Sequence, residues 1–460
     1  MKMKVQLVIE NESGGITMTE VIAIERAADG LIGLSLAEAK AVNASVPRAL
    51  IDAQAGDAVA RGAVCPNCKV GLRHNGSHNT LYRTPFGRIE LTSPPFYACR
   101  CQGTQRTSRS PLSAWLGSHI SPELEYLEGQ FAALLPYGVS AHILNTVLPL
   151  ENVTSITSWH RRIGRIGERL DREAHDALAV KPQLNEFGLP KRHPLQAVGI
   201  DGAYVKATDA PSRQEGWFEV IVGKSLPRQK TGNVFAFVHR LEQKPTERMA
   251  HFLAEQGVDP TQPTTFLSDG GETVRIAQGN FRTFGEPILD WFHVAMRMTV
   301  LTQTLKGVKF DETEVLGRKD NVLRELRRAK AFLWHGSVHT ALEVLDDLSW
   351  LVDAETKASK SFFQRLEEFT EYIPTNTVAI PNYADRCRHG EPIATGFTES
   401  AVNQVVPKRM VKKQQMRWTQ RGAHTLLQVR TRVLNGQLRQ DFERWHPQRK
   451  PTELPLPLAA

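Results

Sequence analysis

Three carboxylates stand out in this sequence by their positions relative to predicted strands and helices. Asp201 follows a short apolar run, Asp269 follows the strand-like run TTFLS, and Glu399 falls in a predicted late helix. Acids at the ends of neighbouring strands can meet a facing helix at one edge of a sheet. Carboxylate oxygens hold Mg²⁺, and two such ions can activate the attacking oxygen of a phosphodiester and stabilise the leaving one. The pattern therefore predicts a Mg²⁺ (or Mn²⁺) site for phosphodiester transfer.

Each of these acids is followed by a small residue, namely Gly202, Gly270 and Ser400. A small neighbour would leave room for a bulky phosphate chain. The ordinary alternatives are that Asp-Gly pairs form turns and that an acid in the first turn of a helix is favoured by the helix dipole. We prefer the metal site because the three acids occur together in a suitable order of elements.

A fourth acid, Asp290, ends the run PILD, and His293 follows it by three residues. If a helix begins here, the two side chains lie on the same side of it. They then either support the metal site or form an Asp–His hydrogen bond at the edge of the core. The sequence leaves both interpretations open.

Four of the five cysteines lie in one short segment, as the knuckles CPNC and CRC around a predicted hairpin whose turn is Pro85 to Gly87. Four thiolates can close a tetrahedron around a structural Zn²⁺, which replaces the apolar core that so small a module lacks. Because the second knuckle is C-x-C, His74 and His78 are alternative ligands, and buried thiols without metal are the other alternative. The predicted ligands are Cys65, Cys68, Cys99 and Cys101.

Positive charge is concentrated near the end of the sequence. The formal net charge is +8, but residues 401–450 carry twelve Lys or Arg against two acids. A local basic stretch is typical of a surface that contacts nucleic-acid phosphates, and a solvated helical face is the alternative. We expect a kink or a restart of the helix at Pro407, with Pro407 at the start of the basic helix, and Trp418 either stacks on a base or packs. The predicted phosphate contacts are Lys408, Arg409, Lys412, Lys413, Arg417 and Arg421.

The elements around the acids predict the core. From residue 195 the order is three strands, helix, strand, helix and strand, which is typical of a ribonuclease H-like mixed sheet with helices on both faces. Residues 296–389 have a helical period and read as an all-helical insertion. The predicted catalytic core therefore has two parts, 195–295 and 390–445, and Thr398 is the expected N-cap of the late helix.

The other segments complete a multidomain α/β fold. Residues 111–180 read as a helical module of helix-turn-helix type, with Ser121 as an N-cap, although a plain three-helix packing module is an alternative. Residues 181–194 read as a linker. The remaining predicted parts are an N-terminal α/β segment at 1–60, a zinc-ribbon-like module at 61–110 and a disordered tail at 446–460.

Composition limits the class of protein. A length of 460 residues predicts several domains, and a hydrophobic content of 41% suffices for their cores. The sequence has no apolar run of ~18 residues, so we expect no membrane span. The first residues read as a strand instead of a signal peptide, and we expect a cytoplasmic, nucleoid-associated protein.

The motifs together resemble a known family. The segments VGIDGAYV, FLSDGGE, ILDWFHV and TGFTES to RGAH, with the cysteine knuckles, are similar to bacterial insertion-sequence transposases of the ISKra group. That group lies within the ribonuclease H-like "DDE" superfamily. The resemblance covers most of residues 60–440. The Asp-x-x-His motif after the second acid is similar to a signature of transposase groups with a helical insertion before the last Glu.

The resemblance implies metal-dependent cutting of DNA at the ends of an element, then joining of the freed 3′-OH to target DNA. Asp201, Asp269 and Glu399 would bind the metal, and Asp290 and His293 match the auxiliary signature. The implied partners are the double-stranded DNA of the terminal repeats and of the target, and a homo-oligomer would hold the two ends. Two alternatives stay open: a DNA-binding regulator derived from a transposase, and a metal-dependent nuclease without strand transfer.

Overall fold

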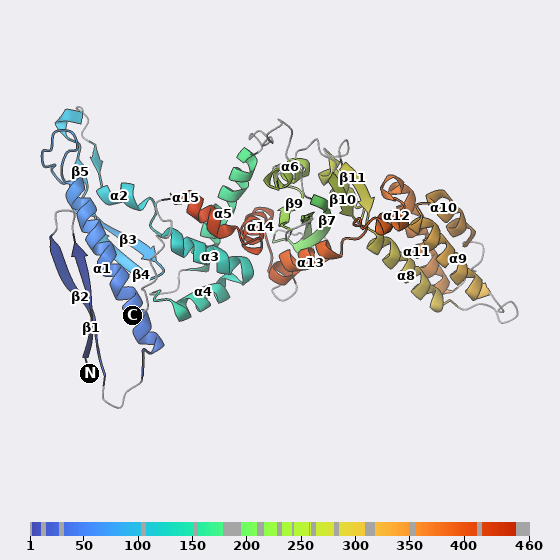
Figure 1. Cartoon of the computed structure of the whole chain (residues 1–460), viewed down its shortest axis with the longest axis horizontal. Coiled ribbons are helices and arrows are strands. Elements are labelled where there is room, and N and C mark those ends of the chain that lie inside the picture. The colour runs from blue at the N-terminus through green and yellow to red at the C-terminus, as the bar shows by residue number, and fades with distance from the viewer. Residues whose placement is uncertain are drawn as a thin grey trace. The chain divides into compact units, whose positions relative to one another are not determined.

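The chain folds into two compact units, which are described separately. One unit comprises residues 1–163 and 436–460, and the other comprises residues 164–435 (Figure 1). The predicted linker 181–194 and most of the predicted tail lie outside the described residues. The computed structural model describes residues 2–10, 15–26, 32–102, 107–150, 155–177, 195–208, 216–227, 232–241, 243–256, 258, 264–279, 285–308, 318–348, 356–411 and 416–447.

The first unit begins with an antiparallel hairpin and a long helix. Strands β1 (Lys2–Glu10) and β2 (Ile16–Glu25) pair, and helix α1 (Leu36–Gly62) packs against β2. Ser35 begins α1 with a capping box, since its side chain accepts from Glu38 N and the Glu38 carboxylate accepts from Ser35 N.

The predicted hairpin of the cysteine segment is confirmed. Strands β3 (Asn79–Thr84) and β4 (Gly87–Thr92) pair in antiparallel register, with Pro85 and Phe86 between them. Alternate side chains of this hairpin are buried with α1 and α2 (Pro111–Leu116). Two short strands, β5 (Phe96–Tyr97) and β6 (Ser108–Arg109), pair beside it.

Helices make up the rest of the first unit. The predicted N-cap is confirmed, because Ser121 accepts from Leu124 N at the start of α3. A buried ion pair joins α5 to α3: Arg162 Nη2 donates to Glu128 Oε1 at 2.7 Å, and Nε donates to Oε2. The helices are α3 (Pro122–Leu134), α4 (Tyr137–Val147), α5 (Ile156–Ala177, which continues into the second unit) and α15 (Leu438–Trp445), which packs on α3.

The second unit is built on a mixed five-stranded sheet of order β11-β10-β7-β8-β9. Strand β8 is antiparallel to both β7 and β9, whereas β10 is parallel to β7 and β11 is parallel to β10. The strands are β7 (Leu195–Lys206), β8 (Trp217–Pro227), β9 (Val234–Val238), β10 (Thr264–Ser268) and β11 (Gly285–Leu289).

Helices lie on both faces of this sheet. On one face, α6 (Pro245–Glu255) and α7 (Glu272–Ala277) pack on apolar side chains of β7, β8 and β9. On the other face, α13 (Gly396–Val405) packs against β7 and β8. Helix α14 (Gln420–Leu434) follows the edge strand β9, where Gln428 Nε2 donates to Ala236 O.

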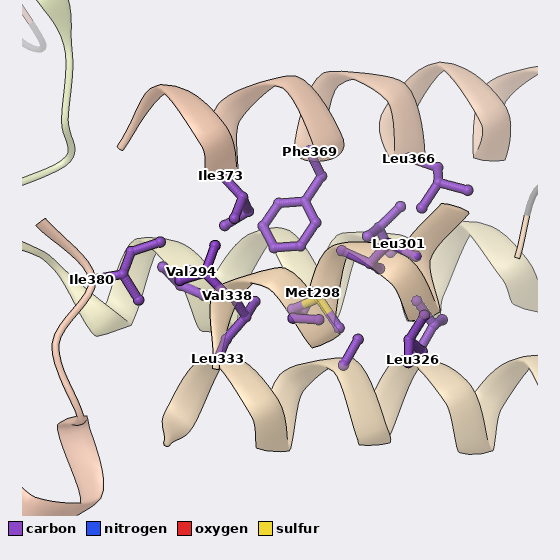
Figure 2. Close-up of a cluster of buried hydrophobic side chains, with 14 of the residues drawn as sticks. Val294, Met298, Leu301, Leu326, Leu333, Val338, Leu366, Phe369, Ile373 and Ile380 are labelled. Carbon is purple, nitrogen blue, oxygen red and sulfur yellow. The ribbon is translucent and has the colours of Figure 1, made fainter. Parts of the chain in front are cut away.

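A helical segment continues the core beyond β10 and β11. Its helices bury a common apolar cluster that Figure 2 shows, with side chains such as Met298, Leu326 and Phe369 pointing toward one another. Leu267 and Leu289 of the sheet belong to the same cluster. The helices are α8 (Trp291–Lys306), α9 (Arg318–Trp334), α10 (Val338–Asp347), α11 (Lys357–Thr375) and α12 (Tyr383–Arg388). No described helix is both long enough and apolar enough to cross a membrane.

Two predicted helix starts are wrong. Thr395, not Thr398, is the N-cap of α13, and Thr398 is buried inside the helix. The expected break at Pro407 is present, because α13 ends at Val405, but the basic helix expected from Pro407 is only a five-residue π-helical turn, Pro407–Val411. The next helix, α14, begins only after its N-cap Thr419.

A polar cluster ties α5 to α6 and α14 in the second unit. Arg248 Nη1 donates to Asp171 Oδ1 at 2.6 Å, and His424 Nε2 lies 3.1 Å from the same oxygen. Burial opposes ionisation of Asp171, but the hydrogen bonds to His424 and Arg248 outweigh it and hold its pKa well below the ordinary value.

The Asp171 cluster predicts a pH-dependent stability. An acid whose pKa is lowered by folding adds stability that is complete above the unfolded value of about 4 and is lost as the pH falls further. We expect Asp171→Asn to cost roughly 2 kcal/mol at pH 7, less than a fully buried pair because Asp171 is partly exposed. Measured by urea unfolding, the cost should stay constant from pH 6 to about pH 5 and then shrink toward pH 3.

The control for this prediction is Asp176→Asn, which removes an exposed carboxylate from the same helix. We expect it to change the stability by less than about 0.5 kcal/mol at any of these pH values. A cost of Asp171→Asn that is the same at pH 6 and pH 3 would contradict the assignment.

Candidate functional site

Two acids directly follow the parallel strands of the second unit. β10 ends at Ser268 and β11 ends at Leu289, so Asp269 and Asp290 leave the sheet at the same edge. Leu267 pairs with Gly199 in parallel register, which brings Asp201 level with Asp269. Burial raises the pKa of Asp201, the charges of Asp269 and Asp290 raise it further, and the charge of His293 lowers it.

The expected strand end at Asp201 is wrong. β7 continues to Lys206, and Asp201 and Gly202 are paired with β8 throughout. The expected room for a phosphate at Gly202 is also absent, because a Cβ there would lie 2.8 Å from Glu219 Oε1. Gly202 therefore admits a second carboxylate from β8, and Asp201 lies on the opposite face of the strand.

The expected turn after Asp269 is present. Gly270 has φ +75°, and Gly271 N donates to Asp269 Oδ1 at 2.9 Å. The space beside Gly270 belongs to the protein, since an added Cβ would overlap Asn376 Oδ1. The small residue therefore permits a tight turn against Asn376 of the helical segment.

Asp290 is a buried helix cap. Its side chain is fully buried, accepts from Phe292 N at 2.7 Å and accepts a hydrogen bond from Thr395 Oγ1. His293 Nε2 lies 3.8 Å from Asp290 Oδ2, so the two residues share one side of the helix start. Of the two interpretations, support of the metal site fits better. Asp290 has a positioning role, because protein donors already occupy its oxygens. The charge of His293 acts on Asp201.

Glu399 lies on the helix that covers the same face of β7 as Asp201. It is exposed in the first turn of α13, and the neighbouring Thr398 rests against Gly199, where an added Cβ would overlap Thr398 Oγ1. Glu399 is not among the charges that act most on Asp201. Within the described part of the chain, only the four cysteines bring three or more His, Cys, Asp or Glu ligand atoms within 4.8 Å of one another.

Sequence reasoning missed Glu219. Thr273 Oγ1 of α7 donates to Glu219 Oε1 at 2.7 Å, on the face of the sheet opposite Asp201. The signal was present, since Glu219 is the acid of an otherwise apolar strand-like run, WFEVIVG. An acid on a strand face that packs against helices calls for a nearby polar partner.

The helical segment holds the backbone of both strand ends. Tyr372 donates its hydroxyl to Asp269 O at 2.7 Å, and Tyr383 donates to Leu289 O at 2.7 Å. Burial raises the pKa of both phenols, so each keeps the proton that it donates. The Arg297 guanidinium lies 4.1 Å from the centre of the Tyr372 ring and fixes it further.

The carboxylate oxygens at this sheet edge are of the kind that hard cations prefer as ligands. No protein-family model matches the chain, and no curated protein matches it. Arguments about function therefore start from the geometry of these residues.

The four predicted cysteines form one cluster in the first unit. Cys65 Sγ lies 3.5 Å from Cys101 Sγ, and Cys68 Sγ lies 3.4 Å from Cys99 Sγ. The cluster could hold a metal such as zinc, and it excludes the alternative ligands His74 and His78.

The geometry of the first knuckle favours a thiolate at Cys65. Backbone N–H groups of Cys68 and Asn67 point at the Cys65 sulfur and lower its pKa to about 6. Lys69 takes the left-handed conformation at φ 60°, which lets its N–H bond back to Cys65 O at 3.0 Å. A compact loop of this kind aims two sulfurs at one point.

The predicted phosphate contacts differ in their surroundings. Lys408 and Arg417 are exposed, and Arg421 is exposed but pairs with Glu168 at 2.7 Å. The prediction for Arg409 is wrong: it is fully buried in the π-helical turn, 5.4 Å from the centre of the buried Trp418 ring. Trp418 therefore packs. Lys412 and Lys413 lie outside the described residues.

Proposed function

We propose that this chain is a metal-dependent DNA transposase, which cuts at the ends of a mobile element and joins the 3′-OH ends to target DNA. The observation that carries the proposal is that Asp201, Asp269 and Asp290 converge on one edge of the mixed sheet. We infer a ribonuclease H-like core, because the sheet is mixed, helices cover both faces and acids follow the parallel strands.

The residues at this edge fit Mg²⁺ (or Mn²⁺). Asp201 and Asp269 supply carboxylate oxygens, which are the ligands that this ion prefers, and their like charges favour a cation between them. Glu399, exposed on the helix that crosses the same face of β7, would complete the set. When bound, two such ions would activate the attacking oxygen and stabilise the leaving one.

The chain's own residues would position these ligands. Tyr372 fixes the backbone of Asp269, and Asp290 joins the start of α8 to Thr395, the N-cap of α13. That contact links the strand edge to the helix that carries Glu399. His293, one-quarter exposed at the same edge, adds a titratable group next to Asp201.

The remaining parts would bind double-stranded DNA of the terminal repeats and of the target. We propose a structural Zn²⁺ on the cysteine cluster, sequence recognition by that module with helices α3 to α5, and phosphate contacts from Lys408 and Arg417. A homo-oligomer would hold the two ends, and the protein would act on the nucleoid.

The test is cleavage of a plasmid that carries the inverted repeats flanking the gene, in the presence of Mg²⁺. We expect Asp201→Asn, Asp269→Asn and Glu399→Gln each to reduce cleavage by at least about 100-fold, since loss of even a supporting residue of a metal site costs ~10–100-fold. The control Glu343→Gln removes an exposed carboxylate of α10 and should keep full activity.

The products decide between related functions. Strand joining supports the transposase, and cleavage without joining would indicate a nuclease. DNA binding without cleavage by the unaltered protein would indicate a regulator. Cleavage undiminished by Asp201→Asn would refute the proposed site.

A further inference from the structure

A cavity of about 260 Å³ lies at the end of β7 and β8 in the second unit. Its walls combine aromatic, basic and acidic side chains, a mixture that the proposed metal site does not use. The residues that line the cavity include Tyr204, Trp217, Glu219, His239, Arg240 and Gln420.

Two aromatic side chains in this cavity face solvent. Tyr204 is 61% exposed and Trp217 is 45% exposed. Tyr204 pairs with Glu219 and Lys206 pairs with Trp217, so the two rings are diagonal neighbours on one face of the sheet. Such neighbours lie ~7–8 Å apart. A planar ring stacked between two other rings makes one contact on each side. Because carbon atoms pack ~3.5–4.0 Å apart, the two outer rings must be separated by twice that distance, which is about the same spacing.

The polar groups suit a planar ligand with an attached anion. Among the described residues, the buried His239 Nε2 has no hydrogen-bond partner, which is costly unless a ligand supplies one. Arg240 is exposed, and Gln420 begins α14, whose N-terminus carries a partial positive charge. A nucleobase with its phosphate combines both properties.

The cavity belongs to the same unit as the acids and includes Glu219, on the face of the sheet opposite Asp201. The charges of Glu219 and Asp269 both act on the Tyr204 hydroxyl and raise its pKa.

We propose that this cavity binds one unpaired nucleobase of a DNA strand, stacked between Tyr204 and Trp217 with its phosphate facing Arg240. The inference rests on the proposed function and deepens it. Local separation of the strands at a cut end costs unpairing free energy, and stacking on aromatic rings offsets that cost.

The test measures binding, without cleavage, of two short labelled duplexes of one sequence. One is fully paired, and the other carries a single unpaired 2-aminopurine; Ca²⁺ replaces Mg²⁺, and fluorescence anisotropy gives both affinities. Because stacking on an aromatic side chain contributes a typical 1–3 kcal/mol, we expect the unpaired base to tighten binding roughly 5- to 150-fold. Tyr204→Ala/Trp217→Ala should abolish this preference and change the affinity for the paired duplex by less than about twofold.

Matched variants keep the result interpretable. Tyr204→Phe and Trp217→Phe keep an aromatic ring and should keep the preference, and so should Trp115→Ala, which removes an exposed tryptophan of α2. Equal binding of both duplexes by the unaltered protein would overturn the cavity proposal alone. Binding of neither duplex would overturn the proposed DNA function, and a preference retained in the double alanine variant would overturn stacking.

Discussion

Removing metal from the proposed zinc site is expected to unfold residues 63–102 and to leave the helical cluster of α8 to α12 folded. The cysteine segment buries few large side chains of its own, among them Phe96 and the Tyr82 and Ile89 side chains of its hairpin. Structural zinc in small modules contributes an apparent ~10–16 kcal/mol, far more than such a core supplies. Hydrogen exchange of peptides from both regions, before and after a chelator, measures the effect.

The zinc prediction has a matched pair of cysteine variants. Cys65→Ser removes a buried ligand and should abolish stoichiometric zinc, whereas Cys387→Ser removes an exposed cysteine outside the cluster and should retain one zinc per chain. Metal analysis of both purified variants gives the answer. Full exchange protection of residues 63–102 in metal-free protein would refute a structural role for the metal.

Arg162→Met is expected to destabilise the first unit by about 3–5 kcal/mol. The substitution leaves the Glu128 carboxylate buried without its partner, and both side chains of the pair are more than nine-tenths buried. Burial already raises the pKa of Glu128, and only Arg162 counters it strongly. Without the arginine the acid binds a proton more readily, so the destabilisation should be smaller at pH 5 than at pH 8. Urea unfolding followed by fluorescence of the buried Trp159 measures it.

Two further variants separate charge from packing. Arg162→Met with Glu128→Met replaces the ion pair by apolar side chains and should recover most of the lost stability. Lys4→Met breaks an exposed pair with Glu20 in the same unit and should cost less than about 1 kcal/mol. A cost of Arg162→Met below about 1 kcal/mol would contradict the importance of the buried pair.

Features set by local rules could be predicted from the sequence. The N-cap at Ser121, the hairpin around Pro85 and the cysteine cluster follow from capping geometry, turn chemistry and ligand spacing. Short apolar runs likewise predicted the five strands of the mixed sheet, although not where β7 ends. In each case the deciding residues are neighbours in the chain.

Features set by distant partners could not be predicted. β7 continues past Asp201 because β8 pairs with it, and Gly202 is required by Glu219 instead of by a turn. Arg409 is buried because the π-helical turn at Pro407 places it beside Trp418. A one-dimensional pattern does not contain these contacts.

The two tyrosine hydroxyls described above change how the helical segment should be regarded. Tyr372 and Tyr383 donate hydrogen bonds to the carbonyls at the ends of β10 and β11. The sheet residues Leu267 and Leu289 also belong to the apolar cluster of the helices. A shortened protein that joins Asp290 directly to Thr395 would therefore lose the support of its own strands. Removal of the helical segment should therefore destabilise the sheet, and we expect the sheet and these helices to form together during folding.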